Sequence, residues 1–305
     1  MSFFLLLKDA IKRTHISWLI NACRFVYIYC SGQSMSIVSK KINEAAKKLI
    51  IPEDITDKVS IICCVWNTDL NFLKTMLDSV INQTYSNWEF CINNCSDAEH
   101  GSVQELLDQY RIKDVRIKIL KNHNQGIAEN SNVAVRAASG TFLFLLDHDD
   151  WLPPHALGCL LMSQKETGAD FIYADECVYF MKQKIGKLSH KGNFSIYTLR
   201  TNNFINHPVL IRKELFDQIH GFRSGFEGSQ DYDLYLRLLE NTERIQYIPQ
   251  ALYYWRINNS SFSQTDLSKC IESGKKALED HLKRMRISGK VVVKGNSPRF
   301  EILSP

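Results

Sequence analysis

The pattern of apolar and polar positions changes near residue 59. From there to residue 175, short apolar runs alternate with segments whose apolar residues recur every three or four positions. The short runs predict strands at 59–66, 88–92, 115–120, 141–147 and 170–175. The segments between them predict helices at 70–83, 103–110, 127–138 and 153–164. Because strands that alternate with helices form βαβ units, we predict an α/β fold with a mainly parallel central sheet flanked by helices.

The alternation is less regular after about residue 180. Helical spacing recurs at 212–219, 229–240 and 264–287, and extended segments are predicted at 244–249, 251–256 and 290–294. Residues 1–50 mix basic and apolar positions at helical spacing. We therefore divide the chain into a helical basic extension (1–56), a βαβ half (57–180) and a less regular half (181–305).

Charge is distributed unevenly over the 305 residues. The net charge of +4 is too small to indicate a nucleic-acid partner. Residues 1–50 nevertheless carry eight basic residues against Asp9 and Glu44: Lys8, Lys12, Arg13, Arg24, Lys40, Lys41, Lys47 and Lys48. Such a basic end suits an anionic membrane surface. Two interpretations stay open, a helical extension packed on the domain and an amphipathic anchor.

Cysteine usage and hydropathy indicate a compartment. The nine cysteines include no CxxC pair and no zinc-ligand spacing, which favours a reducing cytosol. We find no convincing cleavable signal peptide and no apolar run of spanning length. The expected location is cytoplasmic, peripheral at the inner face of the cell membrane.

An acidic motif follows the fourth predicted strand. Asp147, Asp149 and Asp150 come directly after the apolar run "FLFLL". Ligands of parallel sheets bind at the carboxyl ends of strands, and Mg²⁺ or Mn²⁺ prefers carboxylate oxygens. A cation site is one interpretation, and a solvated acidic turn is the other. Asp231 follows the glycine-rich "HGFRSGFEGSQ" and is either a ligand-facing acid or a helix-start acid; Asp233 is expected to be structural.

Six segments in a fixed order resemble family-2 glycosyltransferases with the GT-A (nucleotide-diphospho-sugar transferase) fold, of the bacterial rhamnosyltransferase-like subgroup. The segments are "VSIICCVWN", "LDSVINQTYSNWEFCI", "NQGIAENSNVAVRAASGTFLFLLDHDD", "FIYADE", "GFEGSQDYDLYLRL" and "IPQALYYWRIN". They cover roughly residues 57–290. The resemblance implies that 57–180 binds a nucleotide-sugar and that 181–305 forms the acceptor side.

The resemblance also implies roles for individual residues. Asp231 corresponds to the general base, and Asp149, with Asp150 beside it, to the ligands of Mn²⁺ or Mg²⁺. The implied donor-binding residues are Val65, Trp66, Asn67, Asn93, Asn94, Asn124, Gly126, Asn132 and Asp147. Asn93 and Asn94 stand where the family usually has acids, and a one-residue shift would give their role to Cys95 or Asp97.

Candidates for acceptor or diphosphate contact are His207, Gln230, Trp255 and Arg256. Tyr254 departs from the family, in which many members have a histidine at that position. Arg256 is interpreted as a phosphate partner or a surface ion pair, and His207 as a site residue or a core histidine.

The implied function is an inverting, metal-dependent hexosyl- or deoxyhexosyltransferase. It would move a sugar from a UDP- or dTDP-linked donor to a growing surface polysaccharide, such as O-antigen or capsule, or to a lipid-linked oligosaccharide. One alternative is a catalytically degenerate GT-A module that acts as a binding or scaffold protein. Another is a Mg²⁺-dependent phosphohydrolase or nucleotidyltransferase, which the lone Asp69 after the first strand disfavours.

Overall fold

The computed structural model describes residues 33–46, 50–257 and 266–304. Residues 1–32, which carry four of the basic residues of the predicted extension, lie outside the described residues.

The βαβ half forms as the periodicity predicts. Four parallel strands lie in the order β5-β2-β3-β4, and each crossover between them contains a helix. The strands are β2 (Val59–Val65), β3 (Trp88–Asn94), β4 (Ile117–Lys121) and β5 (Phe142–Leu145). The helices are α4 (Leu70–Ile81), the short η1 (Ala98–His100) with α5 (Gly101–Lys113), and α6 (Ile127–Arg136). Asp69 caps α4, since its carboxylate accepts hydrogen bonds from the Asn71 and Phe72 amides at 2.8 and 3.3 Å.

The sheet continues into the second half as a mixed sheet of nine strands. β8 (Val209–Arg212) lies between β5 and β6 (Phe171–Phe180) and is antiparallel to both. β6 also pairs with β7 (Ile185–Ser189) in antiparallel and with β9 (Ile245–Ile257) in parallel orientation. The sheet therefore runs without a break through the predicted division at residue 180.

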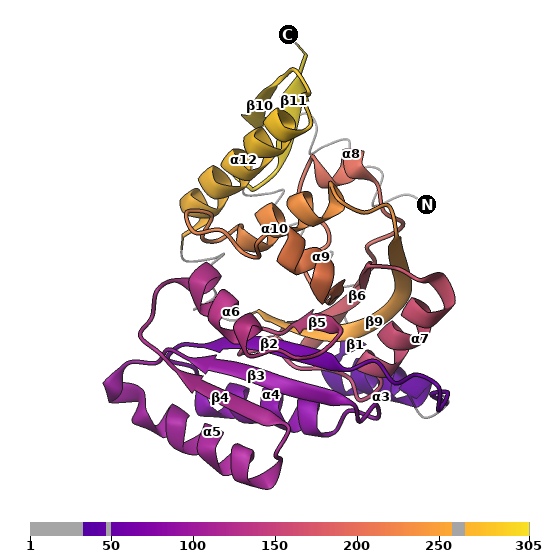
Figure 1. Ribbon diagram of the computed structural model, residues 1–305, viewed down its shortest axis with the longest axis vertical. Helices are drawn as coiled ribbons and strands as arrows, with labels where there is room; N and C mark the ends of the chain where they lie inside the picture. The colour runs from indigo at the N-terminus through magenta and orange to yellow at the C-terminus, as the bar shows by residue number, and fades with distance from the viewer. Residues whose placement is uncertain (1–32, 47–49, 258–265, 305) are drawn as a thin grey trace.

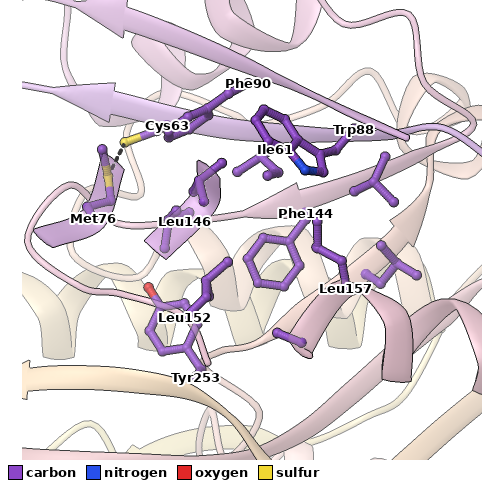
Figure 2. Packing of buried hydrophobic residues seen from close by; sticks show 14 of the residues in the cluster. Ile61, Cys63, Met76, Trp88, Phe90, Phe144, Leu146, Leu152, Leu157 and Tyr253 are labelled. Atoms are coloured by element: carbon purple, nitrogen blue, oxygen red, sulfur yellow. Dashed lines mark hydrogen bonds between the residues drawn. The ribbon is translucent and has the colours of Figure 1, made fainter. Parts of the chain in front are cut away.

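Helices cover both faces of the sheet (Figure 1). One face packs against α4, α5 and α7 (Ala156–Thr167), and the other against α6, α9 (Lys213–Gln218) and α10 (Gln230–Leu239). Figure 2 shows the first of these cores, in which Ile61, Trp88 and Phe144 of three neighbouring strands lie together. Burial of both faces explains why β2 is almost entirely apolar without alternation, as are Phe90, Cys91 and Ile92 in the middle of β3.

Two peripheral parts complete the described structure. β1 (Gln33–Ser34) pairs with β7, and α3 (Met35–Ala46) buries Val38 and Ile42 against Cys177, Ala251 and Tyr254. This described part of the predicted extension is packed on the domain. At the other end, α12 (Leu267–Arg284) packs on α10 beside the hairpin of β10 (Lys290–Val293) and β11 (Phe300–Leu303) (Figure 1).

The structure differs from the predicted elements mainly after residue 180. The two extended segments predicted at 244–249 and 251–256 are one strand, β9, which passes through Pro249. β7, β8, β11 and the one-turn α8 (Ile196–Leu199) were not predicted, because each has only four or five residues and periodicity needs a longer window.

Candidate functional site

The carboxyl ends of β2, β3 and β5 lie at one edge of the sheet because the three strands are parallel. Val65 is buried, and its carbonyl accepts a hydrogen bond from the Cys95 amide at 2.8 Å, so Val65 contributes backbone rather than side chain. The next residue, Trp66, is 51% exposed and presents its ring at this edge.

Asn67 and Asp97 form a reciprocal pair across this edge. Asn67 Nδ2 donates to Asp97 Oδ2 at 2.7 Å, and the Asp97 amide donates to Asn67 Oδ1 at 3.0 Å. Asn67 adopts a left-handed backbone with φ of 49°, which asparagine tolerates better than most residues. The carboxylate that the structure presents after β3 is therefore that of Asp97.

Asn93 and Asn94 are both buried and hydrogen-bonded within the protein. Asn93 Nδ2 donates to the Asn130 backbone carbonyl at 3.0 Å, and Asn93 Oδ1 accepts from Asn122 Nδ2 at 2.9 Å. Asn94 Nδ2 donates to Gln104 Oε1 at 2.8 Å. Asn93 thus supports the loops around the edge, whereas Asn94 also lines a pocket.

That pocket has a volume of about 600 Å³ and opens between the loops that follow β3 and β4. Its lining contains Asp97 and the predicted donor residues Asn94 and Asn124, together with two residues not predicted from the sequence, Lys121 and His123.

The start of α6 adjoins the pocket. Gly126 caps the helix with φ of 88°, a conformation that favours glycine, and its amide donates to Asn124 Oδ1 at 3.0 Å. Asn132, predicted in the same group, lies elsewhere. Its amide group donates to the Phe222 carbonyl at 2.9 Å and accepts from the Phe222 amide at 3.0 Å.

The acidic loop after β5 places its three aspartates at different depths: Asp147 is exposed, Asp149 is half-buried and Asp150 is buried. The Asp147 side chain is 58% exposed, whereas Asp150 is 1% exposed and accepts a hydrogen bond from the Arg256 amide at 2.7 Å. Arg256 also donates from Nε to the Asp149 carbonyl at 2.6 Å. Arg256 is only 7% exposed and stacks over Phe72, so its interpretation as a surface ion pair is wrong: burial between β9 and the loop makes it a support of the loop.

Asp147, Asp150 and His207 form a candidate cation site. Each offers one ligand atom, and the three atoms lie within 4.8 Å of one another. Asp150 Oδ2 is buried and no donor meets it in good hydrogen-bonding geometry, although the Tyr253 hydroxyl lies near enough to lower the pKa of this carboxyl. A buried oxygen without a well-aligned donor is costly unless something else satisfies it. Burial, with Asp149 and Asp147 adding like charge, raises the pKa of Asp150 well above its usual range. The geometry fits a divalent cation, and it includes Asp150 but not Asp149 of the two predicted metal ligands.

The His207 ring is fixed by one hydrogen-bond partner and two aromatic contacts. Its Nδ1 lies 2.9 Å from Glu176 Oε2, and its ring stacks on Tyr253 with centroids 4.3 Å apart. The Trp255 ring meets it edge-on at 5.4 Å. The Tyr253 hydroxyl accepts a hydrogen bond from the Asp147 amide at 3.2 Å. Tyr254, which stands where many family members have a histidine, does not join this group. Its ring stacks on Trp151 with centroids 4.8 Å apart, in the small core formed with α3.

Asp231 lies in the first turn of α10 and is partly buried. Asn203 Nδ2 donates to its Oδ2 at 2.7 Å, and the Tyr232 amide donates to its Oδ1 at 2.8 Å. Burial raises the pKa of Asp231, while His207 lowers it and Asp147 raises it further. Asn203 also accepts a hydrogen bond from the Asn206 amide at 3.4 Å, which connects Asp231 with the loop that carries His207.

The neighbours of Asp231 along the helix have structural contacts. Gln230 Oε1 accepts a hydrogen bond from the Gly228 amide at 2.9 Å and closes the glycine-rich loop. Asp233 is 1% exposed and bridges Arg223 and Arg237, which confirms its expected structural role.

Several residues of the site were missed in the sequence. Glu176 ends the quoted "FIYADE" segment, and two adjacent acids, Asp175 and Glu176, inside a strand of otherwise apolar and aromatic residues were an available signal. Lys191 and Asn203 lie in segments without a motif, and only the tertiary structure brings them to the site. Tyr253 lies in the quoted "IPQALYYWRIN" segment, but nothing in that segment distinguishes it from the neighbouring aromatic residues.

Comparison with known proteins identifies the family and the fold of this chain. The sequence profile of "Glycosyl transferase family 2" matches residues 60–227. An uncharacterised protein of Sinorhizobium fredii is 34% identical over 248 residues, which are 79% of this chain and 27% of that protein. The O-antigen biosynthesis protein RfbC of Myxococcus xanthus is 30% identical over 240 residues, 76% of this chain and 18% of the relative. This chain thus spans about a quarter or less of the length of these relatives.

Solved structures share the fold at low identity. Staphylococcus aureus TarS residues 1–349, in complex with UDP-GlcNAc, superimposes with a TM-score of 0.60 at 17% identity, over 72% of this chain and 65% of that one. A mannosyltransferase of Pyrobaculum calidifontis, in complex with GDP-Man and Mn²⁺, superimposes with a TM-score of 0.56 at 16% identity, over 84% of this chain and 73% of that one. The fold is thus GT-A, and since the family profile covers more than half of the chain, this protein belongs to glycosyl transferase family 2.

Proposed function

We propose that this chain transfers a sugar from a nucleoside-diphosphate donor to a glycan acceptor, with inversion at the anomeric carbon. The observation that carries the proposal is the meeting of two acidic groups from distant parts of the chain. Asn203 donates to Asp231 on α10 at 2.7 Å and accepts from the Asn206 amide at 3.4 Å, so Asp231 is linked to the loop that carries His207 of the candidate cation site. A base on the same side as a cation site suits a displacement in which a hydroxyl attacks opposite a charged leaving group.

The donor nucleoside is assigned to the edge formed by the loops after β2, β3 and β4. The pocket there is lined by hydrogen-bonding groups, and the Asn67–Asp97 pair places an acceptor carboxylate beside the exposed Trp66 ring. A UDP- or dTDP-linked hexose or deoxyhexose is the proposed donor. In this assignment Asn93 and Asn132 support the donor edge without touching the ligand.

The diphosphate is assigned to the acidic loop, with Mn²⁺ or Mg²⁺ held by Asp147, Asp150 and, from the family pattern, Asp149. A bound divalent cation supplies Lewis-acid stabilisation of the charge on the leaving diphosphate. The buried Arg256 holds this loop through the Asp149 carbonyl and the Asp150 carboxylate.

Asp231 is the proposed general base. Its carboxylate takes the proton from the acceptor hydroxyl as that oxygen attacks the anomeric carbon. Asn203 and the Tyr232 amide fix its orientation, and the raised pKa makes it a stronger base than an ordinary aspartate. One base without a nucleophilic carboxylate partner gives a single displacement and hence inversion.

A surface polysaccharide or lipid-linked oligosaccharide is the proposed acceptor. Relatives named for O-antigen biosynthesis and, at 28% identity, as chondroitin synthase support this class. Among the described residues, none of the helices combines the length and hydropathy needed to cross a bilayer. We propose a peripheral attachment to the inner face of the cell membrane through the basic N-terminal segment.

A donor panel tests the function. Purified protein would be incubated with UDP- and dTDP-sugars and Mn²⁺, and thermal stability and nucleoside diphosphate release would be recorded. We expect one donor to raise the melting temperature progressively as its concentration increases, with nucleoside diphosphate release that depends on Asp231. Binding without turnover of any donor, by the wild type and Asp231→Asn alike, would favour the degenerate binding module instead.

A further inference from the structure

Two buried charges behind the acidic loop have no role in the transfer described above. Glu176 on β6 and Lys191, after β7, each have side chains only 2% exposed. Lys191 Nζ lies 3.0 Å from Glu176 Oε1 and donates to the Ile205 carbonyl at 2.7 Å. A buried ion pair gains little stability over apolar residues, so a specific function is a reasonable cause for its presence.

The second oxygen of Glu176 determines which nitrogen of His207 carries hydrogen. Glu176 Oε2 lies 2.9 Å from His207 Nδ1. An ionised carboxylate only accepts hydrogen bonds, so Nδ1 must donate and Nε2 of the neutral ring is left with a free lone pair. Stacking on Tyr253 and the edge contact with Trp255 fix the plane of the ring.

His207 Nε2 points toward the acidic loop. It lies 3.9 Å from Asp147 Oδ2. His207, Asp147 and Asp150 each offer a ligand atom within 4.8 Å of those of the other two. The buried Asp150 Oδ2, which has no hydrogen-bond partner among the described residues, is a second observation that points to a ligand at this place. A carboxylate that binds the far nitrogen of a histidine is the arrangement that orients metal-ligating imidazoles.

We propose that His207 Nε2 is a ligand of the divalent cation and that the Lys191–Glu176 pair is the device that positions it. The inference rests on the proposed function, since it concerns the cation of that site. An imidazole nitrogen in the ligand set favours Mn²⁺ over Mg²⁺, because Mg²⁺ prefers oxygen ligands and Mn²⁺ accepts nitrogen more readily.

Electron paramagnetic resonance with Mn²⁺ tests the ligand directly. The full chain would be titrated with Mn²⁺ in the presence of inorganic pyrophosphate, and spin-echo modulation would be recorded on the bound ion. We expect ¹⁴N modulation in the wild type. In His207→Gln we expect its loss and a dissociation constant for Mn²⁺ raised on the order of 10-fold or more.

His190→Gln is the matched control. His190 immediately precedes Lys191 and also binds a carboxylate, that of Asp175 at 2.7 Å, but it is 72% exposed and outside the cation site. This variant should keep the wild-type modulation and affinity. Circular dichroism would establish that each variant is folded.

The positioning role has its own variant. Glu176→Gln combined with Lys191→Met removes both buried charges and retains similar volume. We expect weaker Mn²⁺ binding, about 10-fold, with the ¹⁴N modulation still present because His207 remains. Unchanged Mn²⁺ affinity in this variant would overturn the positioning role.

The remaining outcomes separate the ligand role of His207 from the proposed metal-dependent sugar transfer. Wild-type Mn²⁺ binding without ¹⁴N modulation, with equal affinity in His207→Gln, would overturn the ligand assignment while metal-dependent sugar transfer could still be observed. Absence of Mn²⁺ binding by the wild type would overturn the inference together with the metal dependence of the proposed function.

Discussion

Three neighbouring acids of one loop have three different environments. Asp147 is exposed, Asp149 is half-buried and Asp150 is buried. Burial raises the pKa of Asp150, which means that the folded protein disfavours its charge. A cation would offset this cost, and for that reason the loop is better explained as a binding site than as a solvated turn.

Asp231→Asn tests the base. Asparagine keeps the size of the side chain but cannot take a proton, so we expect kcat to fall on the order of 100- to 10,000-fold. Donor affinity, measured by thermal shift or calorimetry, should change little because Asp231 is assigned to the acceptor. A loss of donor binding with the same variant would contradict the assignment.

The pH dependence of the reaction follows from the same residue. Because burial raises the pKa of Asp231, its ionised form is lost at a higher pH than for an ordinary aspartate. Activity should therefore fall as pH decreases through the pKa of Asp231, which lies above the ordinary value of 3.8. At higher pH Asp231 stays ionised, so its titration should cause no further change in activity. Profiles of kcat/KM against pH measure this limb. A profile that stays flat down to pH 4 would argue against Asp231 as the base.

At the scale of elements, a polar network ties the first strands together. Glu89 on β3 accepts from Ser60 on β2 at 2.6 Å and forms ion pairs with Lys58 and Lys118, each at 2.8 Å. Burial by itself would raise the pKa of Glu89. Hydrogen bonds from the two lysines, the Ser139 amide and Ser60 outweigh it and hold the pKa far below the ordinary value.

Glu89→Gln should therefore destabilise the protein in a pH-dependent way. Removing one partner of a buried charge cluster costs about 3 kcal/mol of unfolding free energy at neutral pH. The pKa of Glu89 is lower in the folded protein than in the unfolded chain, where it is about 4.5. The stability that ionised Glu89 contributes is therefore present above pH 4.5 and is lost as pH falls toward the folded-state pKa. Urea unfolding at pH 7 and pH 4 measures the difference. The exposed Glu105→Gln should show no such change.

Gly140 marks a close approach between elements. An added Cβ would lie 2.5 Å from the Lys58 carbonyl oxygen and 2.7 Å from Ser60 Oγ. The carbonyl belongs to the backbone immediately before β2, which cannot shift without disturbing the sheet. We expect Gly140→Ala to lower the free energy of unfolding by about 1 to 3 kcal/mol. Gly101→Ala is the control, because nothing lies within 4 Å of its added Cβ. Equal melting temperatures for the two variants would refute the packing argument.

For the molecule as a whole, the site depends on how the two halves of the chain meet. The edge to which we assign the donor belongs to β2–β5, whereas Asp231 and His207 come from the second half. One connection between the halves is Asn132, whose two hydrogen bonds reach the backbone of Phe222.

Asn132→Ala distinguishes two roles for this residue. If it connects the halves, loss of its hydrogen bonds should lower the free energy of unfolding by about 1 to 3 kcal/mol and leave donor affinity unchanged. If it contacts the donor, as the family pattern implies, donor affinity should fall while thermal stability is kept. Calorimetric binding and unfolding of the same sample measure both quantities.

The sequence by itself determined the local elements and the family. Periodicity located the strands and helices of residues 59–175 to within a few positions, and the glycosyl transferase family was identified from ordered motifs. Both are properties of short stretches, since periodicity reports the burial of one element and a motif reports one loop. The metal-ligand and base roles of Asp149, Asp150 and Asp231 stay predictions.

Only the tertiary structure decided which side chains meet. The insertion of β8 between β5 and β6 brings the loop with His207 to the acidic loop, and Lys191 and Glu176 come together behind it. Asp150 faces inward because Arg256, 106 residues away, donates its amide to that carboxylate. Such contacts depend on strand order and packing between distant segments, and no local pattern of apolar and polar residues encodes them.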